Sequence, residues 1–201
     1  IKHELKRDPN GNIAIDPSSG NLSMQETGLR KAGRLAPNYN MGWNNSISYQ
    51  GLTLGFVVSA RVGGLVYSAT QGILDYYGGS QASADARNNG GVPINYGKID
   101  AKKYYQTIST AEGGYGTYYL YSATNVRLQE LSLSYDFPKK WFHNKLNLSV
   151  GLLARNLWMI YCKAPFDPEL SASTSSNFYQ GVDYFMQPST RNIGFNVKVQ
   201  F

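Results

Sequence analysis

A group of carboxylate and amide side chains lies near the start of the chain, at Asp8, Asn10, Asn12 and Asp16. Carboxylate and amide oxygens at alternate positions are the ligands of a calcium loop, which needs glycine at its sixth position for a sharp turn. Ile13 occupies that position here. Segments rich in Asp and Asn also form ordinary turns, because their side chains accept hydrogen bonds from nearby backbone N–H groups. The four residues are therefore a calcium-loop candidate, and the pattern favours a plain turn.

A second acidic pair, Asp167 and Glu169, lies in the segment Ala164–Glu169. Two carboxylates about 5–10 Å apart are the machinery of a glycosidase, and this sequence spacing allows such a separation. The sequence shows no nucleophile motif and no metal-ligand spacing, and its two histidines, His3 and His143, are far apart. We expect no catalytic residue, no cofactor and no enzymatic activity, and we interpret this segment as a structured loop.

The amino-acid composition excludes several kinds of site and several classes of protein. A single cysteine, Cys162, excludes an internal disulfide and a thiolate metal site. The net charge of +6 comes from scattered Lys and Arg residues, which indicates solvated surface and argues against nucleic-acid binding. No apolar run approaches the roughly 18 residues that a membrane helix needs. A membrane β-barrel stays possible, because alternation conceals its apolar surface from any hydropathy average.

Strict alternation of apolar and polar residues predicts β-strands with one apolar and one polar face. The alternating segment 52–67 exceeds the roughly 9–11 residues that a strand needs to cross a bilayer. In that segment Leu54, Phe56 and Val58 point to the same side. The predicted strands are 38–50, 52–67, 125–137, 145–158 and 193–201.

The last strand keeps its pattern to the final residue, with apolar side chains at Ile193, Phe195, Val197, Val199 and Phe201. A terminal strand of this kind, ending on an aromatic residue, resembles the C-terminal assembly signal of bacterial outer-membrane β-barrels. The alternative is an edge strand of a soluble β-sandwich. In the barrel interpretation the five side chains face lipid and also present the assembly signal.

The connections between strands alternate between long and short. Long segments run over 68–119 and 162–188, and short turns lie at Gly51 and 138–144. We expect the first long segment to be a loop with a short helix around 101–108. Outer-membrane barrels have long external loops and short periplasmic turns, so the alternation is typical of them.

Tyrosines are enriched in the long segment, and aromatic rings stack on sugars or provide contact surface for proteins. Packing of the loop on itself is the alternative role. The tyrosines that we take as candidates for contact with substrate or with a lid are Tyr76, Tyr77, Tyr104, Tyr105, Tyr115, Tyr118 and Tyr119.

On the polar faces of the strands, Arg61, Glu130 and Arg155 are predicted to line the lumen of a barrel. The pattern yields five strands, or six if Ile1–Arg7 is the end of another, and the smallest membrane barrels have about eight. An open sheet edge is not tolerated in hydrocarbon. We therefore expect this sheet to pair with further strands on a segment outside these 201 residues.

A run of ordered motifs carries a family resemblance. The motifs, in order, are Pro37–Asn45, Asp85–Gly91, Val126–Tyr135, Gly151–Trp158, Ala164–Glu169 and Pro188–Phe195. In this order and spacing, the chain from about Pro37 onward resembles the C-terminal end of SusC-like (SusC/RagA) TonB-dependent transporters of Bacteroidetes outer membranes.

The resemblance implies an all-β fold in which residues 1–201 form the last five to six antiparallel strands of a barrel of about 22 strands with a plugged lumen. It implies active import of oligosaccharides or peptides across the outer membrane. The implied partners are the rest of the barrel and its plug, a SusD-like surface lipoprotein, TonB, and membrane lipid with lipopolysaccharide. The chain itself contains no plug and no TonB box.

Two other functions stay open. A soluble all-β carbohydrate-binding module would be monomeric without detergent, and Leu54, Phe56 and Val58 would pack against a second sheet. A passive porin would need neither a plug nor a TonB box.

Overall fold

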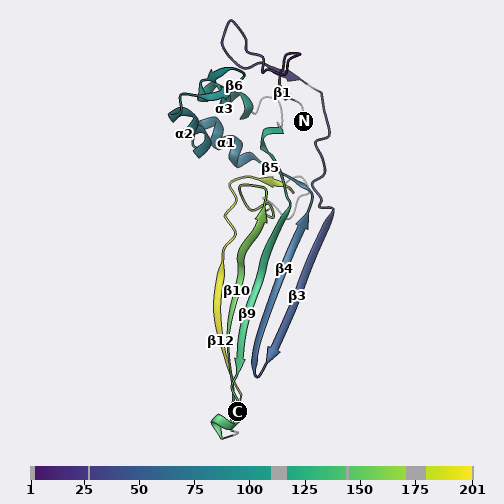
Figure 1. Cartoon of the computed structure of the whole chain (residues 1–201), viewed down its shortest axis with the longest axis vertical. Helices are drawn as coiled ribbons and strands as arrows, with labels where there is room; N and C mark the ends of the chain where they lie inside the picture. Colours follow the sequence, from purple (N-terminus) through teal and green to yellow (C-terminus); the bar gives the residue numbers. More distant parts are fainter. Residues whose placement is uncertain (1–2, 27, 110–116, 144, 171–179, 201) are drawn as a thin grey trace. The chain divides into compact units, whose positions relative to one another are not determined.

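The computed structural model describes residues 3–26, 28–109, 117–143, 145–170 and 180–200 of the chain (Figure 1). No helix among these residues is both long enough and apolar enough to cross a membrane. The chain divides into two compact units, each assembled from three segments. We call them the helical unit (Ile1–Leu35, Leu65–Tyr121 and Ser171–Met186) and the sheet unit (Ala36–Gly64, Ser122–Leu170 and Gln187–Phe201).

The sheet unit is built on one five-stranded antiparallel sheet with the order β12-β10-β9-β4-β3. The five predicted strands are confirmed, with small changes at their ends. The strands are β3 (Tyr39–Tyr49), β4 (Leu52–Val62), β9 (Asn125–Asp136), β10 (Asn147–Cys162) and β12 (Asn192–Gln200).

A tight hairpin joins β3 to β4, where Tyr49 pairs directly with Leu52. The two turn residues, Gln50 and Gly51, have φ values of +47° and +85°. Two successive positive φ angles define a type I′ turn, whose twist matches that of the flanking strands. The glycine also makes a close approach, because a Cβ there would lie 2.7 Å from the carbonyl oxygen of Asp136.

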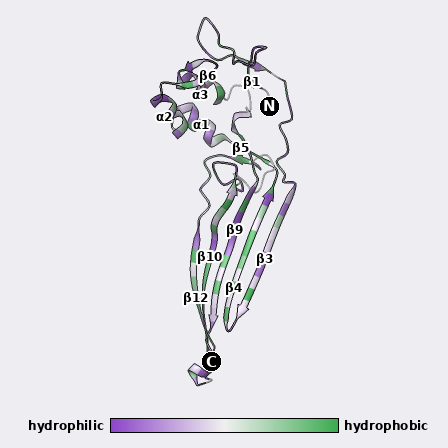
Figure 2. Ribbon diagram, in the orientation of Figure 1, coloured by the Kyte–Doolittle hydropathy of each residue, from purple (hydrophilic) through white to green (hydrophobic). Residues whose placement is uncertain are grey.

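The cross-strand register places apolar residues in continuous rows on one face of the sheet. One row runs across all five strands through Ile47, Leu54, Leu133, Leu152 and Phe195. Figure 2 shows the alternation of hydrophobic and hydrophilic residues along these strands. Because the side-chain period of a strand is two, the residues between them form an equally continuous polar face.

Three register shifts occur along the longer strands. One lies in the pairing of β9 with β4, between Val57 and Val58. The other two lie in β10, between Met159 and Tyr161 and between Arg155 and Trp158, where Asn156 has a φ of +52°. A β-bulge inserts residues that leave the ladder locally. As a result Trp158 still pairs with Leu128 on the same apolar face.

In the helical unit the structure departs from the prediction of a long loop. The short helix predicted around 101–108 is confirmed as α3 (Ala101–Ser109), and two further helices, α1 (Ala69–Tyr77) and α2 (Gln81–Asn88), were not predicted. Ser68 and Ser80 cap these helices by accepting hydrogen bonds from the N–H groups of Gln71 and Ser83. Such N-caps satisfy otherwise unpaired donors at a helix start.

A small hairpin follows α2, formed by β6 (Val92–Ile94) and β7 (Gly97–Ile99). Gly91 precedes it with a φ of +121°, and a Cβ there would clash with the carbonyl oxygen of Ile99. Only glycine fits such a position without moving the backbone. The hairpin helps close a core made of Leu5, Leu22, Ile94, Ile99, Ile108 and Tyr119.

One strand prediction was wrong in detail. The second predicted strand, 52–67, ends at Val62, because Gly63 and Gly64 both have positive φ. The chain then continues as β5 (Leu65–Ser68) in a separate three-stranded sheet of order β11-β5-β8, where β8 is Leu120–Ser122 and β11 is Val182–Asp183.

The alternative of a sixth barrel strand at Ile1–Arg7 was also wrong. The described part of that segment forms β1 (His3–Leu5), which pairs with β2 (Met24–Glu26) in a two-stranded sheet of the helical unit. Two short 3₁₀ helices, Thr117–Tyr119 and Lys139–Phe142, complete the described elements.

Candidate functional site

The acidic residues near the start of the chain lie in two separate turns. Asp8 accepts hydrogen bonds from the backbone N–H groups of Asn10 and Asn12 and from the Asn12 side chain. Asp16 accepts them from the backbone and hydroxyl of Ser18 and from the hydroxyl of Ser19, and these donors lower the pKa of its carboxyl to about 2. The turn interpretation accounts for this geometry, and within the described ranges no three acidic, His or Cys side chains cluster as metal ligands.

The residues of the candidate assembly signal lie on the edge strand β12. Ile193, Phe195, Val197 and Val199 are exposed on the apolar face, with Phe195 81% exposed. β12 pairs with β10 along one side. The last member of the set, Phe201, lies outside the described residues.

The candidate tyrosines differ in their burial. Tyr119 belongs to the core and donates a hydrogen bond from its hydroxyl to Asp75 Oδ2 at 2.9 Å, while Tyr104, Tyr105 and Tyr118 are partly buried and pack against the same core. Burial raises the pKa of Tyr104 and Tyr118. Tyr115 lies outside the described residues.

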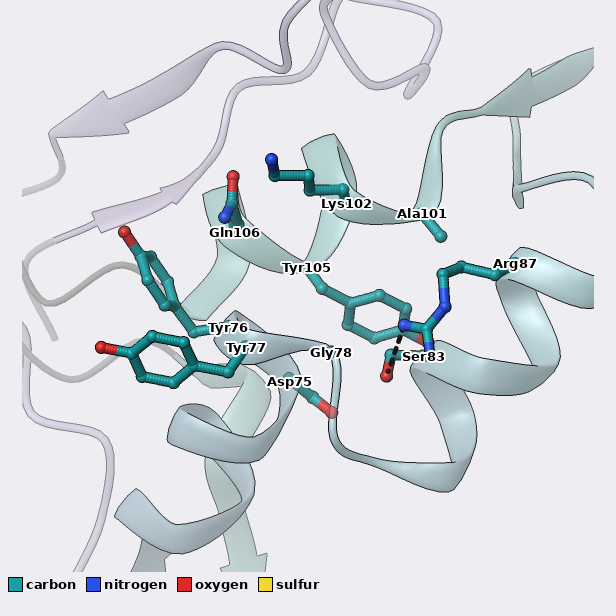
Figure 3. A pocket seen from close by; sticks show the side chains of 10 residues that line it. All are labelled: Asp75, Tyr76, Tyr77, Gly78, Ser83, Arg87, Ala101, Lys102, Tyr105 and Gln106. Atoms are coloured by element: carbon teal, nitrogen blue, oxygen red, sulfur yellow. Dashed lines mark hydrogen bonds between the residues drawn. The ribbon is translucent and has the colours of Figure 1, made fainter.

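Tyr76, Tyr77 and Tyr105 line a cavity of about 360 Å³ between α1, α2 and α3 (Figure 3). Tyr76 and Tyr77 form an edge-to-face pair on α1, and the Tyr105 ring extends from α3 toward the guanidinium of Arg87 on α2. The remaining lining residues are Asp75, Gly78, Ser83, Ala101, Lys102 and Gln106.

The three residues predicted to face a lumen lie on the polar face of the sheet. Arg155 Nε contacts Glu130 Oε2 at 3.1 Å, across directly paired positions of β10 and β9. Arg61 on β4 pairs with Asn125 on β9 in the register. The structure therefore brings Arg155 and Glu130 together, and it places Arg61 further along the same face.

A buried ionic cluster on the polar face was missed by sequence reasoning. The side chain of Arg127 is 6% exposed, and its guanidinium binds both oxygens of Asp167, at 2.7 and 3.2 Å. It also contacts Glu169 Oε2 at 3.2 Å and Asn156 Oδ1 at 3.3 Å. Asn125 extends the cluster by donating to Glu169.

This cluster attaches the segment Ala164–Glu169 to the sheet. Burial acts to raise the pKa of Asp167, but hydrogen bonds from Arg127, from the Glu169 backbone and from Ser189 outweigh it and lower that pKa. The carboxylate is thus charged and paired. The acidic pair of the sequence has a structural partner in Arg127, a residue 40 positions earlier in the chain.

Comparison with known proteins gives one curated relative and several solved structures. No protein-family model matches the chain. It is 26% identical to the TonB-dependent receptor P3 of Formosa agariphila, in an alignment that covers 96% of this chain and 19% of that receptor.

Two solved structures share the fold. The RagAB peptide importer in its "closed-closed" state matches with a TM-score of 0.63 and 19% identity, over 98% of this chain and 22% of that one. The RagAB peptide transporter matches with a TM-score of 0.61 and 18% identity over the same shares. The chain therefore spans about a fifth of the length of these relatives, which have the names of receptors and importers rather than of enzymes.

The antiparallel sheet therefore has the fold of the matched part of the RagAB structures, and the sequence is similar to that of a TonB-dependent receptor with a length about five times greater. These comparisons agree with the resemblance of the ordered motifs to SusC-like TonB-dependent transporters.

Proposed function

We propose that residues 1–201 form the C-terminal part of the barrel of an outer-membrane active importer of oligosaccharides or peptides. In this proposal the barrel has about 22 strands and a plug, a SusD-like surface lipoprotein covers its outer opening, and TonB supplies the energy. The chain has no enzymatic role. Its apolar face contacts lipid, and its polar face lines the lumen.

One observation carries the proposal: the apolar face of the sheet is exposed while its polar face holds buried ion pairs. Leu54 is 38% exposed, and its row neighbours Leu133 and Leu152 are also exposed. On the opposite face Arg127 is buried with Asp167. A soluble protein buries its apolar face, whereas a membrane barrel turns that face to lipid and keeps a polar interior.

The same observation weighs against a soluble carbohydrate-binding module. That alternative requires Leu54, Phe56 and Val58 to pack against a second sheet, and the described residues of the sheet unit contain one sheet. The similarity to a TonB-dependent receptor favours energised import over a passive porin.

Uptake by cells that produce the complete transporter tests the function. Labelled oligosaccharide and peptide mixtures are supplied to cells with the intact gene, with the gene deleted, and with the TonB box removed. We expect one cargo class to accumulate with the intact gene, and its uptake to be lost in both mutants. Uptake that persists without the TonB box would favour the porin. An expressed chain that is monomeric without detergent would favour the soluble module.

A further inference from the structure

The cavity of the helical unit is lined by two cationic side chains, Arg87 and Lys102, that form no ion pair with another described residue. Arg87 donates a long hydrogen bond of 3.4 Å to the Ser83 hydroxyl, and Lys102 lies on the neighbouring helix α3. Among the described residues, neither side chain has a carboxylate within 4.0 Å. A charged group that lines a cavity without a counter-ion is ready to pair with an anion.

The nearest carboxylates are already engaged in other hydrogen bonds. Asp75 is buried and accepts one hydrogen bond on each oxygen, from Gln71 at 3.0 Å and from Tyr119 at 2.9 Å. Asp85 accepts a hydrogen bond of 2.7 Å from Gln81 on the exposed side of α2. Each oxygen of Asp75 therefore already has a partner other than Arg87 or Lys102.

The end of helix α1 leaves space for the guanidinium. Gly78 follows the helix with a φ of +74°, and a Cβ at this position would lie 2.8 Å from Nη1 of Arg87. Glycine is the residue that adopts this left-handed conformation without steric cost. The helix end therefore permits the close approach of Arg87, and this approach places the guanidinium in the cavity beside the Tyr105 ring (Figure 3).

The rest of the lining suits a sugar ring better than a peptide. Aromatic faces at Tyr76, Tyr77 and Tyr105 offer flat amphipathic surfaces, and Ser83 and Gln106 offer hydrogen bonds to hydroxyl groups. Peptides are commonly bound by adding a strand to an open sheet edge. All the lining residues here come from helices and the cap of α1, so the cavity presents no strand edge.

The size of the cavity restricts the ligand further. Ligand pockets range from about 300 to 1,000 Å³, and this one is about 360 Å³. It therefore suits one or two rings at the end of a short chain.

We propose that this cavity binds an acidic sugar unit of an oligosaccharide, with Arg87 and Lys102 pairing with its carboxylate or sulfate group. The inference rests on the proposed function, since it names the chemical class of the cargo. Tyr105 provides the stacking surface beside Arg87.

Binding of defined oligosaccharides to the complete purified transporter tests the proposal. Trigalacturonate is the probe, with its fully methyl-esterified form as the neutral analogue and tetraglutamate as the acidic peptide. Affinity is measured by calorimetry for the natural protein, for Arg87→Gln and for Lys102→Gln. Lys140→Gln is the matched control, because it removes the same charge from the exposed 3₁₀ turn 139–142. Resistance of the barrel to heat in detergent confirms folding of each variant.

We expect each cavity variant to weaken trigalacturonate binding at least about tenfold, because each loses one charge-assisted hydrogen bond. Lys140→Gln should leave the affinity unchanged, and the neutral analogue should bind weakly to every form. Equal affinity in the natural protein and both cavity variants would overturn the proposal, as would tighter binding of tetraglutamate. A failure of this proposal can be told apart from a failure of the proposed import function. The TonB-box experiment measures uptake of any cargo and does not use the cavity variants.

Discussion

The cluster of Arg127, Asp167 and Glu169 predicts that one buried charge, that of Arg127, holds the segment 163–170 against the sheet. Replacement of Arg127 by Gln would leave the Asp167 carboxylate, 9% exposed, without its bidentate partner. Loss of one member of a buried pair costs about 3–5 kcal/mol. That free energy would raise the opening equilibrium of the segment roughly 100- to several thousand-fold.

Hydrogen exchange of the complete transporter in detergent measures this opening directly. Protection of amides in 163–170 should fall by at least about 100-fold in Arg127→Gln. The exposed pair of Arg155 and Glu130 is the matched control, because Arg155 is 63% exposed. A surface pair is worth about 0–1 kcal/mol, so Arg155→Gln should change local protection less than about fivefold.

Two further results test whether the buried charge pair controls the opening of segment 163–170. A double replacement, Arg127→Met with Asp167→Leu, should recover much of the protection, because hydrophobic residues of similar volume often replace a buried pair without loss. Equal protection in Arg127→Gln and Arg155→Gln would refute the reasoning, since the buried and exposed pairs would then contribute alike.

The same cluster has a defined dependence on pH. The pKa of Asp167 is lowered in the folded protein, so its contribution is fully present above the ordinary value of 3.8 and is lost as pH falls through the lower folded value. Protection of 163–170 should therefore be constant between about pH 5 and 7. A loss of protection within that range would show that another group controls the segment.

Three other replacements test the fold and the assignment of its faces. Gly91→Ala should destabilise the helical unit by about 1–3 kcal/mol, because of its positive φ, whereas Gly97→Ala, with open space around it, should have little effect on thermal unfolding. Tyr119→Phe should cost about 1–3 kcal/mol, since it removes a donor from a buried carboxylate, and thermal unfolding measures it too. Leu152→Arg on the apolar face should cost about 2–4 kcal/mol and lower membrane insertion, while Leu153→Arg on the polar face should insert normally.

Each of these predictions has a contrary result. Equal stability of the two glycine variants would mean that the backbone around Gly91 adjusts freely. An unchanged Tyr119→Phe variant would mean that another donor reaches the carboxylate. Equal insertion of the two arginine variants would remove the distinction between the faces on which the barrel assignment depends.

The sheet was predictable because its signal is local. Alternation along each strand places Leu54, Leu133 and Leu152 on one face without any knowledge of the partner strands, and the register then aligns them. The turn at Gly51 was predictable for the same reason, since glycine supplies the positive φ that a two-residue hairpin needs.

The helices and the ionic cluster were harder to predict for different reasons. α2 consists largely of small and polar residues and has no apolar stripe, although the caps at Ser68 and Ser80 were local signals that mark helix starts. The pairing of Arg127 with Asp167 joins residues 40 positions apart, and nothing in the local pattern of either one specifies the other. The cavity likewise depends on three helices whose packing no sequence period encodes.

The middle segment of the helical unit, Leu65–Tyr121, is inserted in the chain between β4 and β9, and this has a consequence for folding kinetics. These two strands are direct neighbours in the sheet, although the chain between Val62 and Asn125 separates them. The inserted chain starts with β5 and ends with β8, which are themselves neighbours in one small sheet. Once that sheet forms, the effective loop between β4 and β9 shrinks from about 60 residues to a few. The entropic cost of closing the loop then falls by roughly 2 kcal/mol. Early folding of the insertion would therefore accelerate the pairing of β4 with β9, turning a slow, non-local contact into a nearly local one.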